Sequence, residues 1–210
     1  MLKNEIKDII SETNYQKYKK WYNNYIEDVD FTEVEWKKFN FNELMCFLHQ
    51  NYYDEEYESF VMVRDESNNF LPIGMTYLSF NKLDEKDEYL LGLVTNNQGL
   101  KTIVACMIFK SKCLLEYDSI KPITYIETVE VNKYFQRNGL FTQMIRVLPQ
   151  FIDNDQNIVI TPDESVGKTI GVNDRIKTLL LDNGFEHDIR SEYEIDEEYL
   201  MCLKNKRKIK

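Results

Sequence analysis

Four consecutive residues that could do chemistry, Gln136, Arg137, Asn138 and Gly139, lie between an alternating segment and an apolar one. Residues 124–131 read TYIETVEV, and β-branched or aromatic residues with a period of two predict a strand there. Apolar residues then recur at helical spacing after the glycine, so a helix is predicted to start near Gln136. The apolar positions of this helix are Phe141, Met144, Ile145 and Leu148.

This order of strand, turn and helix predicts a site for an anion. The first amides of a helix have no partner within it, and they lie at the positive end of its dipole. Several consecutive N–H groups can therefore hold a phosphate, and Gly139 lets such a ligand approach closely. The residues predicted to form the site are Gln136, Arg137, Asn138, Gly139, Leu140 and Phe141.

The segment resembles the acyl-CoA signature of the GNAT N-acetyltransferase superfamily. That signature is Arg or Gln, two residues of any kind, Gly, any residue, then Gly or Ala, and Gln136 and Gly139 match it. Phe141 stands where the small residue is usual, a departure that is tolerable if its side chain turns into the core. Residues 173–185, NDRIKTLLLDNGF, resemble the family's later helix, with Gly184 at the C′ position. The resemblance covers roughly residues 90–200.

The resemblance implies acetyl-CoA as cosubstrate, and the spacing of the histidines and cysteines predicts no metal site. The amides of 137–141 would hold the diphosphate of this cosubstrate, to which Arg137 could add a cationic contact unless it is merely solvated. The pantetheine arm would lie along the strand up to Val131, and the thioester carbonyl would accept from an amide near Val129. Asn173 could bind the pantetheine arm, although capping the later helix is the favoured role.

Glu127 is the candidate general base, acting directly or through water. Strict strand alternation predicts that Glu127 shares a face with Val129 and Val131, and that Glu130 points to the opposite face. In several members of the family an acidic residue lies near the acceptor amine at the matching position. The alternative is a half-exposed carboxylate that pairs with a neighbouring lysine. Family members often place a tyrosine acid where this chain has Leu180, so the acid stays unassigned.

The predicted fold is a mixed α/β (α+β) domain. Its centre is a mixed, mostly antiparallel twisted sheet with helices on both faces, as in GNAT acyltransferases, and extra helices lie at the N-terminus. One domain spans residues 1–210, with a helical part (1–55) that walls the acceptor pocket and includes a third helix capped by Thr32. The acetyltransferase core spans 56–203 and a basic tail 204–210. Strands are expected at 59–63, 74–80, 88–94, 101–109 and 157–161.

Composition predicts a cytoplasmic protein with neither a membrane span nor a signal peptide. A net charge of −10 argues against a nucleic-acid surface and favours a cationic amine as substrate. The four cysteines form no C-x-x-C pair and are expected to be reduced core thiols; the two histidines lack metal-ligand spacing.

Three functions compete at this point. The first is an acetyl-CoA-dependent N-acetyltransferase that acts on a primary amine of a small molecule or protein. A second is a GNAT-like module that binds coenzyme A or a partner without turnover, an alternative raised by Leu180 and Phe141. The third is an unrelated acidic α/β protein whose turn only mimics the motif.

Overall fold

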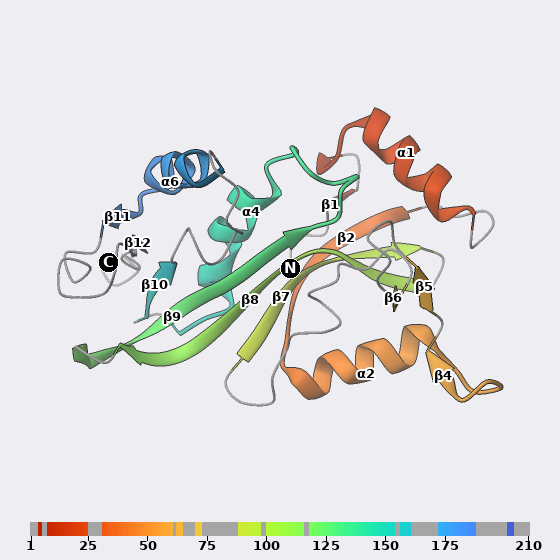
Figure 1. The fold of residues 1–210 in the computed structure, drawn as a ribbon, viewed down its shortest axis with the longest axis horizontal. Coiled ribbons are helices and arrows are strands. Elements are labelled where there is room, and N and C mark those ends of the chain that lie inside the picture. The colour runs from red at the N-terminus through yellow and green to blue at the C-terminus, as the bar shows by residue number, and fades with distance from the viewer. Residues whose placement is uncertain are drawn as a thin grey trace.

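The chain forms one large mixed sheet, shown in Figure 1. The computed structural model describes residues 4–5, 8–24, 31–60, 62–64, 70–72, 88–97, 100–115, 118–153, 156–160, 172–187 and 201–203. Eight strands follow one another in the order β1-β2-β7-β8-β9-β10-β12-β11. The described pairs are antiparallel except β9 with β10, which run parallel. The predicted mixed, mostly antiparallel sheet is therefore confirmed.

The elements have the following bounds. The strands of the large sheet are β1 (Asn4–Glu5), β2 (Phe31–Phe39), β7 (Glu88–Asn97), β8 (Leu100–Leu115), β9 (Asp118–Val131), β10 (Asn157–Ile160), β11 (Glu186–His187) and β12 (Met201–Leu203). Two short ribbons pair β3 (Tyr53–Asp54) with β4 (Ser59–Phe60) and β5 (Met62–Arg64) with β6 (Phe70–Pro72). The helices are α1 (Glu12–Tyr22), α2 (Phe41–Tyr52), α4 (Leu140–Val147), α6 (Val172–Asp182) and the 3-10 helix η2 (Leu148–Gln150).

The core lies around β8, where every residue from 103 to 109 is buried. Such a continuous apolar run fits a strand that is covered on both faces. Its neighbours β7 and β9 pair along both of its edges, so the sheet is most completely covered at its centre. The predicted strands at 88–94, 101–109 and 124–131 are confirmed.

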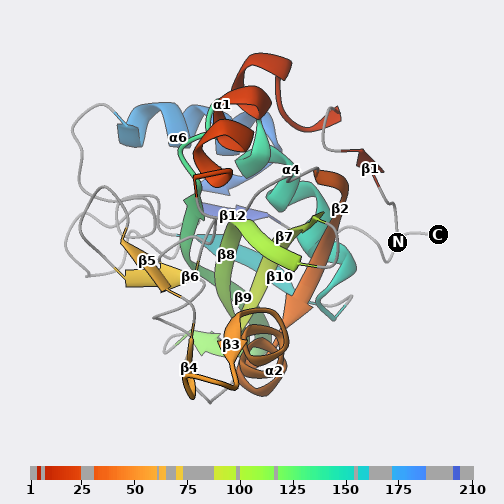
Figure 2. The same cartoon turned by 90° about the vertical axis from the view of Figure 1, so that its right-hand side faces the viewer.

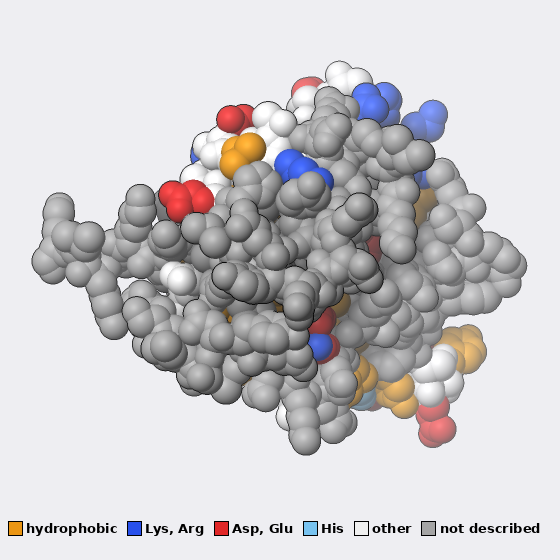
Figure 3. Space-filling model, turned by 60° about the vertical axis from the view of Figure 1, so that its left-hand side comes forward, with side chains coloured by type: hydrophobic (Ala, Val, Ile, Leu, Met, Phe, Trp, Pro, Cys, Tyr) orange, Lys and Arg blue, Asp and Glu red, His pale blue; other side chains and the backbone are white. Residues whose placement is uncertain are grey.

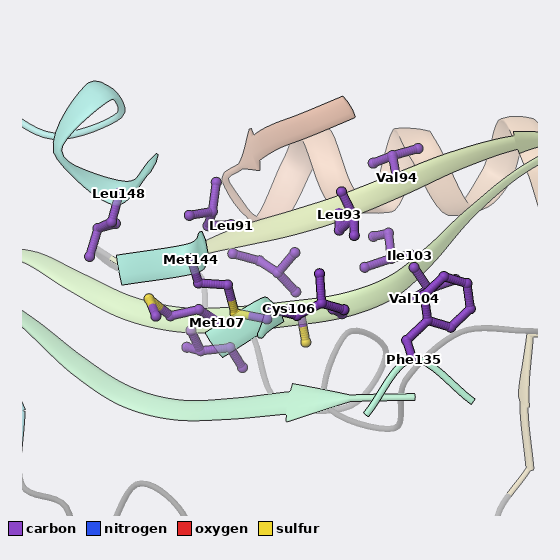
Figure 4. Packing of buried hydrophobic residues seen from close by; sticks show 14 of the residues in the cluster. Leu91, Leu93, Val94, Ile103, Val104, Cys106, Met107, Phe135, Met144 and Leu148 are labelled. Carbon is purple, nitrogen blue, oxygen red and sulfur yellow. The ribbon is translucent and has the colours of Figure 1, made fainter. Parts of the chain in front are cut away.

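Helices cover both faces of this sheet, as Figures 1 and 2 show for α2 on one side and α4 on the other. On the α2 side the ring of Phe47 lies 5.2 Å from that of Phe39. On the other face Met144 and Leu148 lie beside Met107 and Leu91 in Figure 4. The alternation of side chains along each strand therefore decides which helix each one meets.

The first 55 residues are not all helical, which corrects the prediction. Residues 31–39 form β2, whose described residues pair with β7 from Phe31↔Asn97 to Phe39↔Leu90. This pairing outweighs local propensity, so Thr32 lies in a strand and caps no helix. Asn40 is the actual cap of α2, forming a capping box with Glu43. Cys46 on this helix is exposed, whereas Cys106 is buried as predicted.

Helix α1 lies at one end of the sheet, where Tyr22 and Tyr52 both direct their hydroxyls to Thr102. The Oη–Oγ1 distances are 3.4 Å for Tyr22 and 2.8 Å for Tyr52. Burial raises the pKa of Tyr22 to about 12, although its bond to Thr102 lowers it in part. The predicted strand at 74–80 and the basic tail lie outside the described residues. In the part that is described, no helix is long and apolar enough to cross a membrane.

Candidate anion and thioester site

The predicted anion loop connects β9 to α4, but α4 begins at Leu140 and not near Gln136. The chain from Lys133 to Gly139 forms turns instead. Asparagine explains the difference, because its side chain stabilises turns in competition with a helix. Asn132 accepts from the amide of Tyr134 through Oδ1 at 3.1 Å and from that of Phe135 through its carbonyl at 2.8 Å. The helix therefore starts one turn later, with Gly139 at its N-cap.

The backbone of this loop alternates in handedness. Arg137 has a φ of 62° and Gly139 a φ of 72°. Among the described non-glycine residues, only Glu58 and Arg137 have a positive φ. Asn138, between Arg137 and Gly139, and Leu140, after Gly139, therefore have negative φ values. Alternating signs of this kind curl successive N–H groups toward one concave side, which is the geometry of an anion-binding nest.

The amides of the loop are available to a ligand. Within the described part of the chain, no acceptor takes the backbone N–H of Arg137, Asn138, Gly139, Leu140 or Phe141. Gly139 is exposed, and a Cβ added there would meet no described atom within 4 Å. Helix N-termini with unpartnered amides attract anions, because these amides carry the positive end of the helix dipole. The predicted residues thus come together as a set of free donors.

The side chains of the motif brace the loop. Gln136 Nε2 donates to the carbonyl of Val131 at 3.1 Å, which ties the end of β9 to the turn. Asn138 Nδ2 donates to the carbonyls of Phe135 and Gln136 at 3.0 and 2.9 Å. Leu140 is buried, and Phe141 packs half-buried against the core, which is the condition under which its departure from the motif is tolerable. Arg137 is exposed.

The strand that precedes the loop extends beyond the described part of its parallel neighbour. The described pairing of β9 with β10 ends at Ile126↔Ile160, whereas β9 continues to Val131. Val129 and Val131 lie on this extension, half-buried against the core. The place where a pantetheine arm is predicted to lie is therefore the stretch of β9 beyond the described pairing.

Glu127 lies at a β-bulge, which corrects the prediction that it shares a face with Val129. The register steps from Phe109↔Ile126 to Ile108↔Thr128, so Glu127 is the extra residue of β9. Strand alternation is interrupted there, and the Glu127 carboxylate reaches Lys110, which points to the same face as Ile108. Val129 pairs with Met107 on the opposite face.

The same bulge places Glu130 on the Glu127 side of the sheet, because Glu130 pairs with Cys106. This is the face that α2 covers, since Phe39, Leu90 and Ile108 form one cross-strand row. The prediction that Glu130 points away from Glu127 is therefore wrong.

Lys110 carries the charge that faces Glu127. Its Nζ lies 2.5 Å from Glu127 Oε1 and 3.0 Å from Glu88 Oε1. The side chain of Glu88 is 8% exposed and that of Glu127 28%, so the lysine neutralises carboxylates that water reaches only in part. Hydrogen bonds to Glu127 and then to Glu88 raise the pKa of Lys110. Sequence reasoning allowed for a lysine partner without identifying Lys110, whose place opposite Glu88 depends on strand register.

The later helix confirms part of its prediction. Gly184 has a φ of 86°, and the amides of Gly184 and Phe185 donate to Leu181 and Leu180 at 2.9 and 3.0 Å. This is a Schellman C-cap, as the Gly-Phe pair predicts. Asn173 is the second residue of α6 and so is not its cap, and its side chain lies outside the described part. The side chain of Leu180 is fully buried.

Two other features of the described chain bear on ligand chemistry. A hollow of about 290 Å³ is lined by Glu33, Val34, Glu35, Val94, Asn96 and Lys101, none of which belongs to β9 or the loop. Among the described residues, no group of three or more His, Cys, Asp or Glu side chains could hold a metal ion. On the face drawn in Figure 3, the described charged side chains of both signs are interspersed.

Solved structures are the known proteins that this chain resembles. No family model matches the sequence, and no curated protein matches it. Solved structures that match include AtaTR bound with AcCoA, at 9% identity and a TM-score of 0.48, with 82% of this chain and 94% of that chain covered. The ribosomal-protein-S18-alanine N-acetyltransferase from Escherichia coli matches at 14% identity and 0.42, over 82% and 94% of the two chains.

A GNAT-family acetyltransferase from Listeria monocytogenes matches at 14% identity and a TM-score of 0.40, over 82% of this chain and 95% of that chain.

Proposed function

We propose that the chain is an acetyl-CoA-dependent N-acetyltransferase of the GNAT type. One observation carries the proposal: five consecutive amides, those of residues 137 to 141, lie without acceptors in the described chain on a loop that curls toward one side. The loop follows directly on a strand that extends beyond its described parallel partner. A diphosphate joined to an extended thiol-bearing arm fits such a combination of donors and strand.

In this proposal the coenzyme A diphosphate accepts from the amides of 137–141. Exposed Arg137 can add a charge-assisted contact to a phosphate oxygen. The pantetheine arm lies along β9 up to Val131, as an added strand would. The amide near Val129 donates to the thioester carbonyl oxygen and stabilises the negative charge that develops there.

Glu127 is proposed as the general base. It takes a proton from the acceptor ammonium, directly or through a water, and the neutral amine then attacks the thioester carbonyl. The C–N bond forms and the C–S bond breaks, and the second proton of the attacking nitrogen passes through water to the departing thiolate, so that coenzyme A leaves as the thiol. Glu127 lies on the face that α2 covers, which is the side where the resemblance implies an acceptor pocket. Buried Leu180 supplies no proton, so water is the proposed source.

The acceptor is proposed to be a primary amine of a small molecule or a protein. The net charge of −10 favours approach of a cationic one. Glu127 and Glu88 pair with the ammonium of Lys110, and this pairing supports a cationic acceptor on the same face. The cytoplasm is the proposed setting.

A second candidate is a module that binds coenzyme A without turnover. The ion pair between Lys110 and Glu127 favours it, because the lysine ammonium occupies a carboxylate oxygen that would have to take the proton. Leu180, in place of the tyrosine often found in the family, points the same way.

Adding acetyl-CoA to the purified protein separates these candidates. A rise of the Tm together with release of free thiol, in the presence of a panel of amines, polyamines, aminoglycosides and peptides, supports the transferase. A rise of the Tm without thiol release supports the binding module. If neither a rise of the Tm nor thiol release is observed, the loop does not bind coenzyme A, and both proposals are wrong.

A further inference from the structure

Helix α1 packs on the anion loop. The ring of Tyr18 lies 4.8 Å from that of Phe135 in an edge-on arrangement, and both side chains are fully buried. Trp21 lies 5.7 Å from Tyr134. Aromatic pairs of this geometry contribute about 0.5–1.5 kcal/mol beyond the area that they bury. A helix more than a hundred residues away in sequence therefore holds the turn that precedes α4.

A hydrogen bond joins the two elements next to the free amides. The backbone N–H of Ser11, the N-cap of α1, donates to Asn138 Oδ1 at 3.2 Å. The amide nitrogen of the same Asn138 side chain donates to the carbonyls of Phe135 and Gln136. Asn138 thus links the start of α1 to the turn, and it lies between the two residues of positive φ, Arg137 and Gly139.

We propose that α1 is a positioning element for the diphosphate loop, acting through Ser11 on Asn138 and through Trp21 on Tyr134. This inference rests on the proposed function and deepens it. A positive φ at Arg137 is unfavourable for a residue with a Cβ, so the loop keeps its curl only where neighbours hold it. Ordering the donors before the ligand arrives reduces the entropy cost of binding. Coenzyme A affinity therefore depends on α1 through its contacts with the loop.

Ser11 offers a matched pair of variants. Its φ is −62°, which is the value that proline imposes, so Ser11→Pro removes the N–H with little backbone change at this residue. Ser11→Ala removes the side-chain cap to Asn14 and keeps the N–H. Both variants weaken the cap of α1, and only the proline loses the bond to Asn138.

The experiment is a calorimetric titration of the full-length variants with coenzyme A and with pantetheine, which lacks the diphosphate. Ser11→Pro should raise the Kd for coenzyme A about three- to tenfold, the equivalent of one hydrogen bond, and leave the affinity for pantetheine unchanged. Ser11→Ala should bind coenzyme A within about twofold of the wild type, even though its stability falls. If α1 had a merely structural role, both variants would bind both coenzyme A and pantetheine more weakly, and to a similar degree.

Trp21 gives a second, independent pair. Trp21→Ala should raise the Kd for coenzyme A, and Trp21→Phe, which keeps a ring against Tyr134, should restore it. The control is Tyr53→Ala at the C-terminal end of α2, which removes a ring stacked on His49. This pair decides the matter if Ser11→Pro does not fold.

Two failures remain distinguishable. If the wild type does not bind coenzyme A, the proposed function fails and the inference fails with it. If the wild type binds, and the folded Ser11→Pro and Trp21→Ala variants bind equally tightly, the proposed function stands and the role of α1 is wrong.

Discussion

The ammonium of Lys110 lies 2.5 Å from the carboxylate of Glu127, at the bulge where β9 departs from strict alternation. This pair places the candidate base on the side of the sheet that α2 covers, and it supplies the charge that any acceptor ammonium must displace or share. The first predictions follow from this relationship.

Glu127→Gln should lower turnover about a hundredfold or more and leave coenzyme A binding unchanged, because amide groups cannot take the proton. Steady-state kinetics with the true acceptor and calorimetry with coenzyme A measure the two quantities. Glu130→Gln is the comparison, since the bulge brings Glu130 to the same face. A large loss with Glu130→Gln and none with Glu127→Gln would transfer the role of base to Glu130.

Lys110→Met should destabilise the fold by about 1 kcal/mol, because it removes a cation from the nearly buried Glu88 and from Glu127. The lysine itself is 39% exposed, so solvent screens much of the attraction. Urea unfolding at neutral pH measures the change. A variant as stable as the wild type would show that the pair contributes nothing net.

Gly139→Ala should cost roughly 1–2 kcal/mol of stability, because alanine is strained at a φ of 72°. It should also weaken coenzyme A binding, and Gly139→Trp should abolish it, since a side chain there projects into open space beside the free amides. Gly184→Ala is the matched control, at a φ of 86° on α6.

The control should lose similar stability and bind coenzyme A like the wild type. Equal coenzyme A affinity in Gly139→Trp and the wild type would remove this loop from the cofactor site.

Stability should fall steeply in alkali. The pKa of Tyr22 is raised by burial to about 12, against an ordinary value near 10, so the folded state holds its proton more tightly than the unfolded state. The contribution of protonated Tyr22 to the free energy of unfolding is therefore complete below about pH 10 and is lost as pH rises toward 12. Unfolding midpoints across this range measure it. Tyr22→Phe should show a shallower fall, and an identical slope would exclude Tyr22 as a cause.

The sequence predicted the parts of this fold that depend on local pattern. Periodicity located β9, α4 and β10, and Gly184 marked the end of α6, because alternation, apolar spacing and a positive-φ position are all written in neighbouring residues. The free donors around Asn138 were predicted for the same reason, although the turns of Asn132 delay the helix.

The remainder depends on distant residues. Segment 31–39 becomes a strand because β7 pairs with it. Its charged residues interrupt the apolar pattern from which a strand is predicted, so the sequence alone did not indicate this strand. The bulge at Glu127 arises from register with β8, so alternation alone placed the side chain on the wrong face. Helix α1 meets the loop through contacts such as Tyr18 with Phe135, which no spacing in the sequence reveals.

The central claim is that the amides of 137–141 hold the diphosphate of coenzyme A. Titrating ¹⁵N-labelled protein with coenzyme A and following its backbone amide resonances tests this directly. The account predicts that the largest saturable shifts fall on Arg137 through Phe141, and that pantetheine leaves them in place. Saturable binding of coenzyme A that leaves these five amides unmoved, or no binding at all, would contradict it.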